Sequence, residues 1–235
     1  MYSITPKGEQ IRNMFGAIAP RYDFLNRLLS LGIDRRWRRI AVGLVRCGAG
    51  GRVLDVATGT GDVALTIAAR TSPDVRVTGI DFCEEMVAIG REKVAASPYA
   101  ERIELIVAPC EEIPFPDGTF ASVTIAFGIR NVVDRPRGLA EMYRILQPGG
   151  NAVILEFSTP VFPPFRALYY WYFLTVLPAI GGIFSQKSAY RYLPESVLEF
   201  PNREEFKKLM TQAGFRNPTH RDVTFGIATI YCGDK

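Results

Sequence analysis

Residues 53–62 read Val-Leu-Asp-Val-Ala-Thr-Gly-Thr-Gly-Asp. Residues 53–56 are mostly apolar and rich in valine, which is typical of a buried parallel strand. Gly59 and Gly61 then let the backbone turn sharply and approach a ligand where a Cβ atom would clash. Apolar residues at helical spacing resume over 62–70. The stretch therefore predicts a strand, a glycine turn and a helix, with a ligand at the turn.

An acidic residue completes this pattern. Asp81 follows Gly61 by twenty positions and ends a second apolar run at 75–80. At the end of the neighbouring strand, its carboxylate can accept hydrogen bonds from both hydroxyls of a ribose. A tight turn that binds nothing is the alternative, but Asp55 and Asp81 at two adjacent strand ends would then be costly to bury. The pair favours a nucleoside site.

The glycine spacing distinguishes between two cofactors. Dinucleotide enzymes use G-x-G-x-x-G, whereas the third residue after Gly61 is Ala64. The stretch resembles motif I of the class I S-adenosylmethionine (SAM) methyltransferases, with Ala57 in place of the usual first glycine. This resemblance favours SAM over a nicotinamide dinucleotide as the cofactor.

The remaining periodicity predicts one α/β domain over residues 1–235, with a class I SAM methyltransferase (Rossmann-like) seven-stranded sheet. Pro20 divides two N-terminal helices over 8–31, and alternating strands and helices after residue 52 imply a doubly wound parallel sheet. We expect an N-terminal helical cap at 1–47, a SAM-binding core at 52–158, a hydrophobic lid insertion at 160–190, and a C-terminal helix and strands at 202–235. The expected strands are 52–56, 75–80, 103–107, 121–126, 152–157, 219–223 and 226–232, and the expected helices include 36–46, 61–70, 84–96, 135–146 and 202–213.

Residues 167–184 contain no charge, which meets the minimum length for a membrane span. Pro178, Gly181 and Gly182 interrupt the segment, so a spanning helix is the weakest interpretation. A buried core helix is a second one. We favour a hydrophobic lid that covers an apolar substrate pocket and touches the membrane, because the segment opens with interfacial Tyr and Trp residues.

Composition limits the function classes. The chain has 48% hydrophobic and 22% charged residues, and its formal charge of +4 is too small to argue for nucleic acid. The four cysteines show no metal spacing and favour free thiols in a reducing cytosol. Arg35, Arg36, Arg38 and Arg39 surround Trp37. They are typical of a solvated helix face with one buried tryptophan. Contact with anionic lipid headgroups or with nucleic acid is the functional alternative, and of these two we favour lipid.

Several longer segments resemble one family, the bacterial and mitochondrial C-methyltransferases of menaquinone and ubiquinone synthesis. Its N-terminal signature is similar to residues 22–26 with Ser30 and Trp37, although Leu25 and Asp34 depart from it. The segments 126–132, 144–158 and 190–196 also resemble this family. Pro109-Cys110 is a further departure, because the family usually has Asn or Asp before Ala there to position adenine. Tyr231 stands where the family tends to have histidine, and we expect the only histidine, His220, to be non-catalytic.

The resemblance implies a site for SAM and for a polyprenyl quinol. We expect neither a metal nor a nucleic acid partner. We expect a cytoplasmic protein that makes transient contact with the inner face of the membrane. Whether it forms a homodimer stays open. The expected cofactor residues are Asp55, Ala57, Thr58, Gly59, Thr60, Gly61, Asp81, Phe82, Met86, Pro109, Cys110, Glu111, Ala126 and Phe127.

Three further residues are expected to act on the acceptor. Arg130 follows the fourth strand and could stabilise a phenolate, Asn131 could bind an oxygen, and Tyr22 comes from helices that cover the cofactor in similar enzymes. An ion pair of Arg130 with Asp134 or Glu156 is the structural alternative. Naphthoquinol and benzoquinol acceptors both remain open. The competing functions are methylation of RNA or protein, methylation of another small aromatic acceptor, and a SAM sensor without activity.

Overall fold

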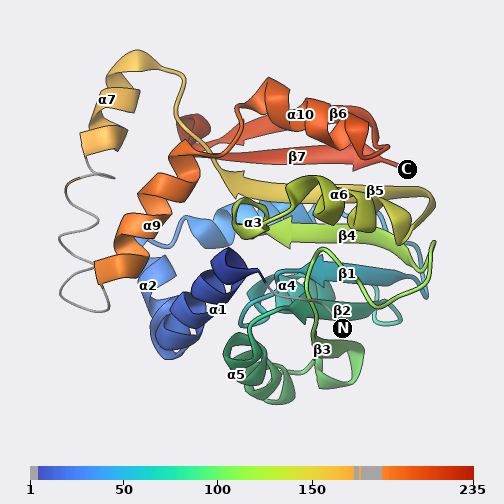
Figure 1. Ribbon diagram of the computed structural model, residues 1–235. Coiled ribbons are helices and arrows are strands. Elements are labelled where there is room, and N and C mark those ends of the chain that lie inside the picture. Colours follow the sequence, from blue (N-terminus) through green and yellow to red (C-terminus); the bar gives the residue numbers. More distant parts are fainter. Residues whose placement is uncertain (1–4, 172–174, 176–186) are drawn as a thin grey trace.

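The computed structural model describes residues 5–171, 175 and 187–235 (Figure 1). Their centre is a seven-stranded sheet in the order β3-β2-β1-β4-β5-β7-β6, which confirms the expected strand number. The strands are β1 Arg52–Val56, β2 Arg76–Asp81, β3 Ile103–Val107, β4 Phe120–Ala126, β5 Leu146–Phe157, β6 Arg216–Val223 and β7 Ala228–Asp234.

The sheet is mixed, and the parallel arrangement predicted for its first five strands is confirmed. β1 to β5 pair in parallel, whereas β7 is antiparallel to both β5 and β6. β6 and β7 are joined by a single 3₁₀ turn, η5 (Thr224–Gly226), and so short a connection can join only antiparallel neighbours. β5 also begins six residues before the expected 152, because Pro148-Gly149-Gly150 lie within the strand.

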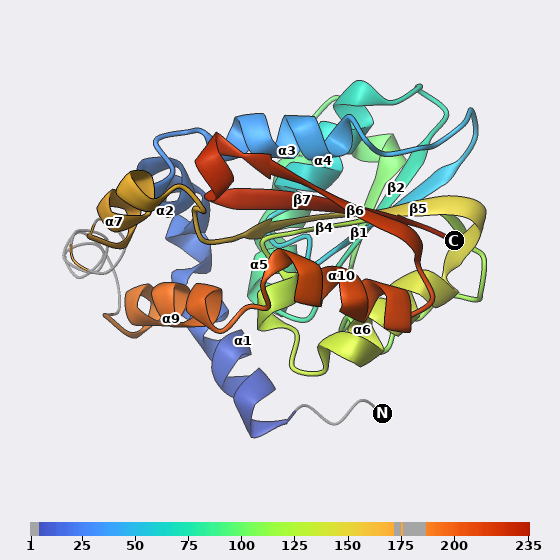
Figure 2. The same ribbon diagram turned by 90° about the horizontal axis from the view of Figure 1, so that it is seen from above.

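Helices cover both faces of the sheet (Figure 2). α3, α4 and α5 pack against one face through a shared apolar cluster that includes Val42, Ile67 and Val87, and α6 and α10 cover the other through Leu139 and Phe206. The helices are α1 Pro6–Ile18, α2 Tyr22–Leu29, α3 Asp34–Val42, α4 Asp62–Arg70, α5 Glu84–Ala95, α6 Arg135–Arg144, α7 Pro163–Trp171, α9 Lys187–Leu198 and α10 Arg203–Gln212. Short 3₁₀ turns lie at Ala19–Arg21 (η1), Ala100–Arg102 (η2) and Ile129–Asn131 (η3).

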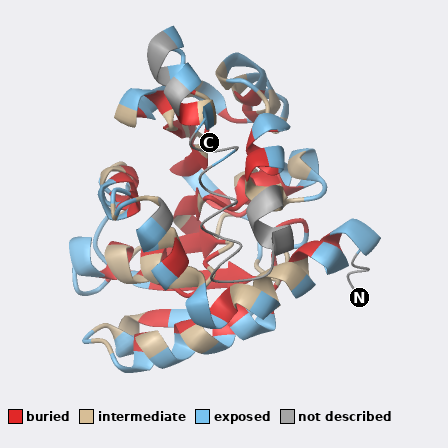
Figure 3. Cartoon of the chain, turned by 90° about the vertical axis from the view of Figure 1, so that its left-hand side faces the viewer, coloured by how far each residue is buried: buried red, intermediate tan, exposed pale blue. Residues whose placement is uncertain are grey.

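The N-terminal helices cover the end of the sheet where the parallel strands finish. α1, α2, α7 and α9 lie at this end, on the left in Figure 1, and it faces the viewer in Figure 3. Pro20 lies in η1 between α1 and α2, as expected. α3 ends at Val42, four residues before the expected Arg46, because Gly43 follows it as the C-terminal cap.

Of the uncharged segment 167–184, the structure describes residues 167–171, which belong to α7, and residue 175. The expectation of a lid, a core helix or a spanning helix over its other residues lies outside the described part of the chain. Tyr169 is buried against Leu25 and Val197, whereas Trp171 is exposed. None of the described helices combines the length and the apolar character that crossing a bilayer demands.

Close packing in the middle of β2 predicts a strong effect of one added methyl group. A Cβ atom at Gly79 would meet the Leu105 side chain at 2.5 Å and Thr58 Oγ1 at 2.8 Å. We expect Gly79→Ala to lower the free energy of unfolding by about 1–3 kcal/mol, because overpacking forces neighbours out of their preferred rotamers. Gly48→Ala is the matched control, since no atom lies within 4 Å of its added Cβ. Urea denaturation of both variants checks this, and equal midpoints would contradict it.

Candidate active site

The glycine turn between β1 and α4 has the backbone conformation that the sequence indicated. Ala57, Gly59 and Gly61 all have positive φ, at 50°, 54° and 81°. Ala57 accepts this left-handed conformation at a cost of about 1–2 kcal/mol. A Cβ atom added at Gly59 would meet no atom closer than 4.0 Å, so the backbone there borders open space. The turn thus presents bare backbone to a cavity.

Asp55 lies beneath this turn rather than in the cavity. Its carboxylate accepts hydrogen bonds from Thr58 Oγ1 at 2.6 Å and from Thr124 Oγ1 at 2.7 Å. Burial raises its pKa to about 6. Because both oxygens are engaged, the side chain ties the turn to β1 and β4.

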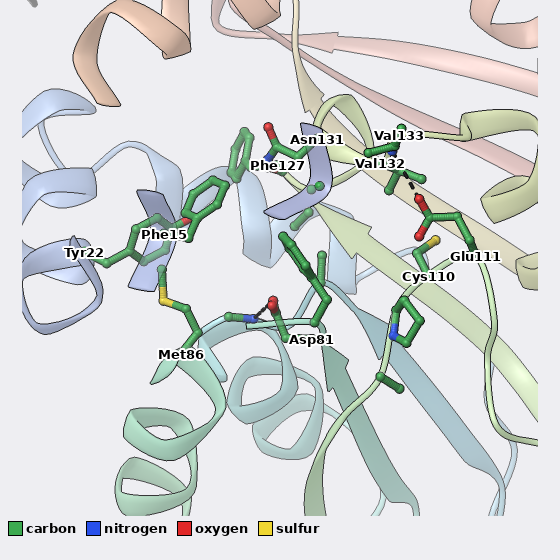
Figure 4. Close-up of a pocket in the computed structure, with 18 residues that line it drawn as sticks. Phe15, Tyr22, Asp81, Met86, Cys110, Glu111, Phe127, Asn131, Val132 and Val133 are labelled. Carbon is green, nitrogen blue, oxygen red and sulfur yellow. Dashed lines mark hydrogen bonds between the residues drawn. The ribbon is translucent and has the colours of Figure 1, made fainter. Parts of the chain in front are cut away.

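The cavity beside the turn has an empty volume of about 780 Å³, part of it open to solvent (Figure 4). The structure brings together ten of the fourteen expected cofactor residues in its lining; Asp55, Thr58, Thr60 and Gly61 support the turn instead. The ten are Ala57, Gly59, Asp81, Phe82, Met86, Pro109, Cys110, Glu111, Ala126 and Phe127.

Asp81 is the central polar group of the cavity. Its Oδ2 accepts a hydrogen bond from the Gly59 backbone N–H at 2.9 Å, and its Oδ1 accepts one from the Cys83 N–H at 2.9 Å. The side chain is only 7% exposed, and burial raises its pKa to about 6 despite these bonds. A carboxylate oxygen has more than one lone pair, so each oxygen can accept a further bond from a ligand hydroxyl.

The far wall of the cavity is formed by residues 108–111 and the loop that follows η3. Pro109 offers no backbone N–H, as the sequence indicated. Cys110 is buried, and this burial raises the pKa of its thiol. Glu111 Oε1 accepts a hydrogen bond from the Val133 N–H at 3.1 Å. A flat apolar ring system can therefore lie against this wall, held by backbone groups and packing.

A polar network behind the turn connects it to the N-terminal helices. Lys93 Nζ lies 2.6 Å from Asp23 and 2.5 Å from Asp62, and Arg38 lies 2.6 Å from the other oxygen of Asp62. Burial of Asp62 opposes its ionisation, but the two cations outweigh burial and hold its pKa below the ordinary value. Thr60 also donates to Asp23 at 2.6 Å. No local pattern in the sequence indicates this network, since its members are up to 70 residues apart.

Arg130 does not line the cavity, which confirms the structural alternative for this residue. Its guanidinium lies 3.0 Å from Glu156 Oε1, and its backbone N–H donates to Glu156 Oε2 at 3.1 Å. It also lies over the ring of Phe157, 5.5 Å from the centroid. The expected pair with Glu156 is therefore present, and the buried arginine orders the end of β5.

The other two expected acceptor residues do reach the cavity. Asn131 Oδ1 accepts a hydrogen bond from Tyr192 Oη at 2.9 Å. Tyr22 packs edge-on against Phe15, with ring centroids 6.1 Å apart (Figure 4). Burial raises the pKa of Tyr22 and of Tyr192, while the positive charge of Arg130 lowers both.

Phe15 and Tyr192 are additions to the expected set. The helical spacing of apolar residues around Phe15 indicated only that this side chain packs in the core. Tyr192 belongs to segment 190–196, which resembles the family, but nothing in the sequence pattern assigns it a role.

Comparison with known proteins identifies the family. The model of the ubiE/COQ5 methyltransferase family matches residues 4–235. The chain belongs to this family. It is 69% identical to the Ubiquinone/menaquinone biosynthesis C-methyltransferase UbiE of Geobacter sulfurreducens, over all of this chain and 92% of that protein. It is 47% identical to the Demethylmenaquinone methyltransferase of Deinococcus radiodurans, over 97% of this chain and 94% of that protein.

Solved structures support the fold alone. A SAM-dependent methyltransferase from Aquifex aeolicus matches 80% of this chain and 84% of its own, with a TM-score of 0.60 and 20% identity. The [4+2]-cyclase SpnF matches 98% and 97%, with a TM-score of 0.73 and 16% identity. The solved structures confirm the expected fold class, and the family match confirms the methyltransferase activity and SAM as the cofactor.

The raised pKa of Asp81 predicts a pH dependence of SAM binding. Its ordinary value is about 3.9, and burial raises the pKa to about 6. The carboxylate that would accept the ribose hydroxyls is therefore lost as the pH falls through about 6. We expect the affinity for SAM to fall by up to about tenfold per pH unit below pH 6. Calorimetric titration from pH 5 to pH 8 measures this.

Asp81→Asn provides the control, because an amide does not titrate. We expect it to bind SAM about tenfold or more weakly at pH 8, since a hydrogen bond to a charged acceptor contributes about 1.5–3 kcal/mol. Its affinity should change little between pH 5 and pH 8. If the variant keeps the full pH dependence, Asp81 is not the titrating group.

Proposed function

We propose that the protein methylates a ring carbon of a demethylated polyprenyl quinol, as in the last methylation of menaquinone synthesis or the corresponding benzoquinol step. The activities for which two relatives are named support this proposal, at 69% and 47% identity over nearly the full chain. The observation that carries it is the arrangement of one cavity. Asp81 and the glycine turn border its polar end, and Phe15, Tyr22 and Phe127 border an aromatic end.

The polar end fits the nucleoside of SAM. Asp81 would accept both ribose hydroxyls, Gly59 leaves room for the close approach, and the adenine would lie against Pro109 and Cys110. SAM, when bound, supplies a methyl group on a positively charged sulfur. The rest of the catalysis falls to the chain, which must hold the acceptor carbon in line and exclude water; orientation alone can contribute about 7–11 kcal/mol.

The aromatic end fits a quinol ring. Phe127, which packs on Phe157 behind it at 4.4 Å between ring centroids, and Tyr22 offer flat apolar walls. Asn131 is held by Tyr192 and could bind one ring oxygen. Loss of the phenolic proton to water would place negative charge on the ring carbon to be methylated.

Arg130 would assist that deprotonation from a distance. Its charge lowers the pKa of Tyr22 and Tyr192, and the same field would favour the phenolate of an acceptor between them. Glu156 offsets part of this charge, so we assign Arg130 a supporting electrostatic role rather than direct contact.

We further propose a single domain that works on the cytoplasmic face of the membrane, where the acceptor is dissolved. In this proposal residues 160–190 act as the hydrophobic lid and residues 1–47 as the cap over SAM. The burial of Tyr169 at the carboxyl end of the sheet supports a lid in that position.

A direct assay tests the proposal. We expect purified protein to transfer labelled methyl from SAM to demethylmenaquinol, or to the demethylated benzoquinol, under reducing conditions. The oxidised quinone should accept none, because it has no phenolic proton to lose. Mass spectrometry of the extracted lipid gives the position of the label. Label in RNA or protein but in no quinol would contradict the proposed function.

The same assay tests how Asn131 is positioned. Tyr192→Phe removes only the hydroxyl that donates to Asn131, and one neutral hydrogen bond contributes about 0.5–1.5 kcal/mol. We expect kcat to fall about fivefold with unchanged affinity for SAM. Tyr99→Phe is the control, since Tyr99 lies before β3, away from the cavity lining. Equal loss in both variants would contradict the role of Tyr192.

A further inference from the structure

Exposed apolar side chains gather at one corner of the molecule. The described part of the chain has eleven large apolar residues that are exposed, and eight of them lie in α2, the α2–α3 turn, η5, or α7 with its preceding loop. Leu31 at 81% and Phe225 at 73% are the most exposed. α2 and α7 lie at the same end of the molecule in Figures 1 and 2. Single exposed apolar residues are ordinary, but a cluster marks an interaction surface.

Contacts connect these elements into one surface, which we call the corner surface. Trp37 Nε1 donates to Thr224 Oγ1 at 2.7 Å and holds η5 against α3. A shallow groove between them is bordered by Ile33 and Phe225. Ser158 Oγ donates to the Gly226 carbonyl at 2.8 Å, which brings the loop before α7, with Val161 and Phe162, beside η5.

The backbone at this surface is strained at three residues. Leu31, Thr224 and Phe225 have positive φ values of 52°, 47° and 57°. Each costs about 1–2 kcal/mol for a residue with a Cβ atom. Such strain persists where the surrounding structure enforces it, and it concentrates at functional sites.

The charge of the corner surface is positive. The acids on these elements are paired with other cations: Asp34 is buried against Arg38, Asp222 is bound to Arg203 at 2.7 Å, and Asp23 lies 2.6 Å from Lys93, so they do not cancel the exposed arginines. The arginine cluster of the sequence is thus divided, with Arg38 inside and the other three exposed. The exposed arginines on these elements are Arg27, Arg35, Arg36, Arg39, Arg166 and Arg221.

We propose that the corner surface docks on an anionic lipid bilayer. Its arginines contact lipid phosphates, and Leu31, Ile33 and Phe225 enter the boundary between headgroups and acyl chains. Charge complementarity selects this occupant over a second copy of the chain, because two such basic surfaces repel each other. The inference rests on the proposed function in one respect, since a bilayer holds the polyprenyl acceptor.

The corner surface shares a wall with the cavity. Trp37, which lies behind the groove, packs against Phe127 at 6.1 Å between ring centroids, and Phe127 lines the cavity. One aromatic layer therefore separates the bilayer side from the acceptor end.

Cosedimentation of the full chain with vesicles tests the proposal. The chain should bind vesicles of phosphatidylcholine with phosphatidylglycerol and not vesicles of phosphatidylcholine alone. Leu31→Glu with Phe225→Glu should weaken binding about tenfold or more. Arg35→Gln with Arg36→Gln should weaken it about thirtyfold, because each arginine near the surface contributes about fivefold.

Matched controls carry the same chemical changes elsewhere. Val107→Glu with Leu198→Glu, and Arg70→Gln with Arg216→Gln, alter exposed residues outside the corner surface and should bind within about twofold of the parent. Unchanged binding of the corner variants, equal loss in the controls, or no binding by the parent would overturn the proposal. So would a dimer of the parent that Leu31→Glu with Phe225→Glu dissociates, because a second copy would then be the occupant.

A soluble acceptor separates this proposal from the proposed function. The corner variants should methylate a short-chain, water-soluble demethylquinol at the parental rate while losing vesicle binding. If the parent methylates no quinol but its vesicle binding still depends on the corner surface, the proposed function fails and the docking surface stands.

Discussion

The candidate site depends on the carboxylate of Asp81, buried at the carboxyl end of β2. Two backbone N–H groups, from the glycine turn and from the start of α5, converge on its two oxygens. The parallel pairing of β1 and β2 brings the turn and this carboxylate together, because the two strands end at the same edge of the sheet. Burial is unfavourable for the charged form, and a ligand with two hydroxyls would compensate for the lost water.

A network of ion pairs behind the glycine turn connects the Asp81 site to the surrounding helices. Lys93 on α5 bridges Asp23 on α2 and Asp62 at the start of α4, and Arg38 on α3 reaches the same Asp62. Four helices therefore meet at the glycine turn through paired charges. Breaking an ion pair of this kind leaves a partly buried charge without its partner. We therefore expect the N-terminal helices and the glycine turn to become ordered together.

The sequence indicated the parts of this site that depend on local pattern. The glycine turn, Asp81 and the seven strands follow from periodicity and spacing, and the family segments indicated the reaction class. The predicted end of α3 and the predicted start of β5 were wrong, because the sequence alone does not tell where a helix stops before a glycine or whether a Pro-Gly-Gly segment turns or continues into a strand. The ion pair of Arg130 with Glu156 was stated only as an alternative, and the Lys93 network was not found at all. Such pairs join residues far apart in the chain, and no local period encodes them.

The most direct test of this account is a crystal structure of the protein with S-adenosylhomocysteine. The account predicts both ribose hydroxyls within hydrogen-bond distance of the Asp81 carboxylate, the adenine against Pro109 and Cys110, and the sulfur directed toward Phe127 and Asn131. A nucleoside bound elsewhere, or a ribose that makes no contact with Asp81, would contradict it.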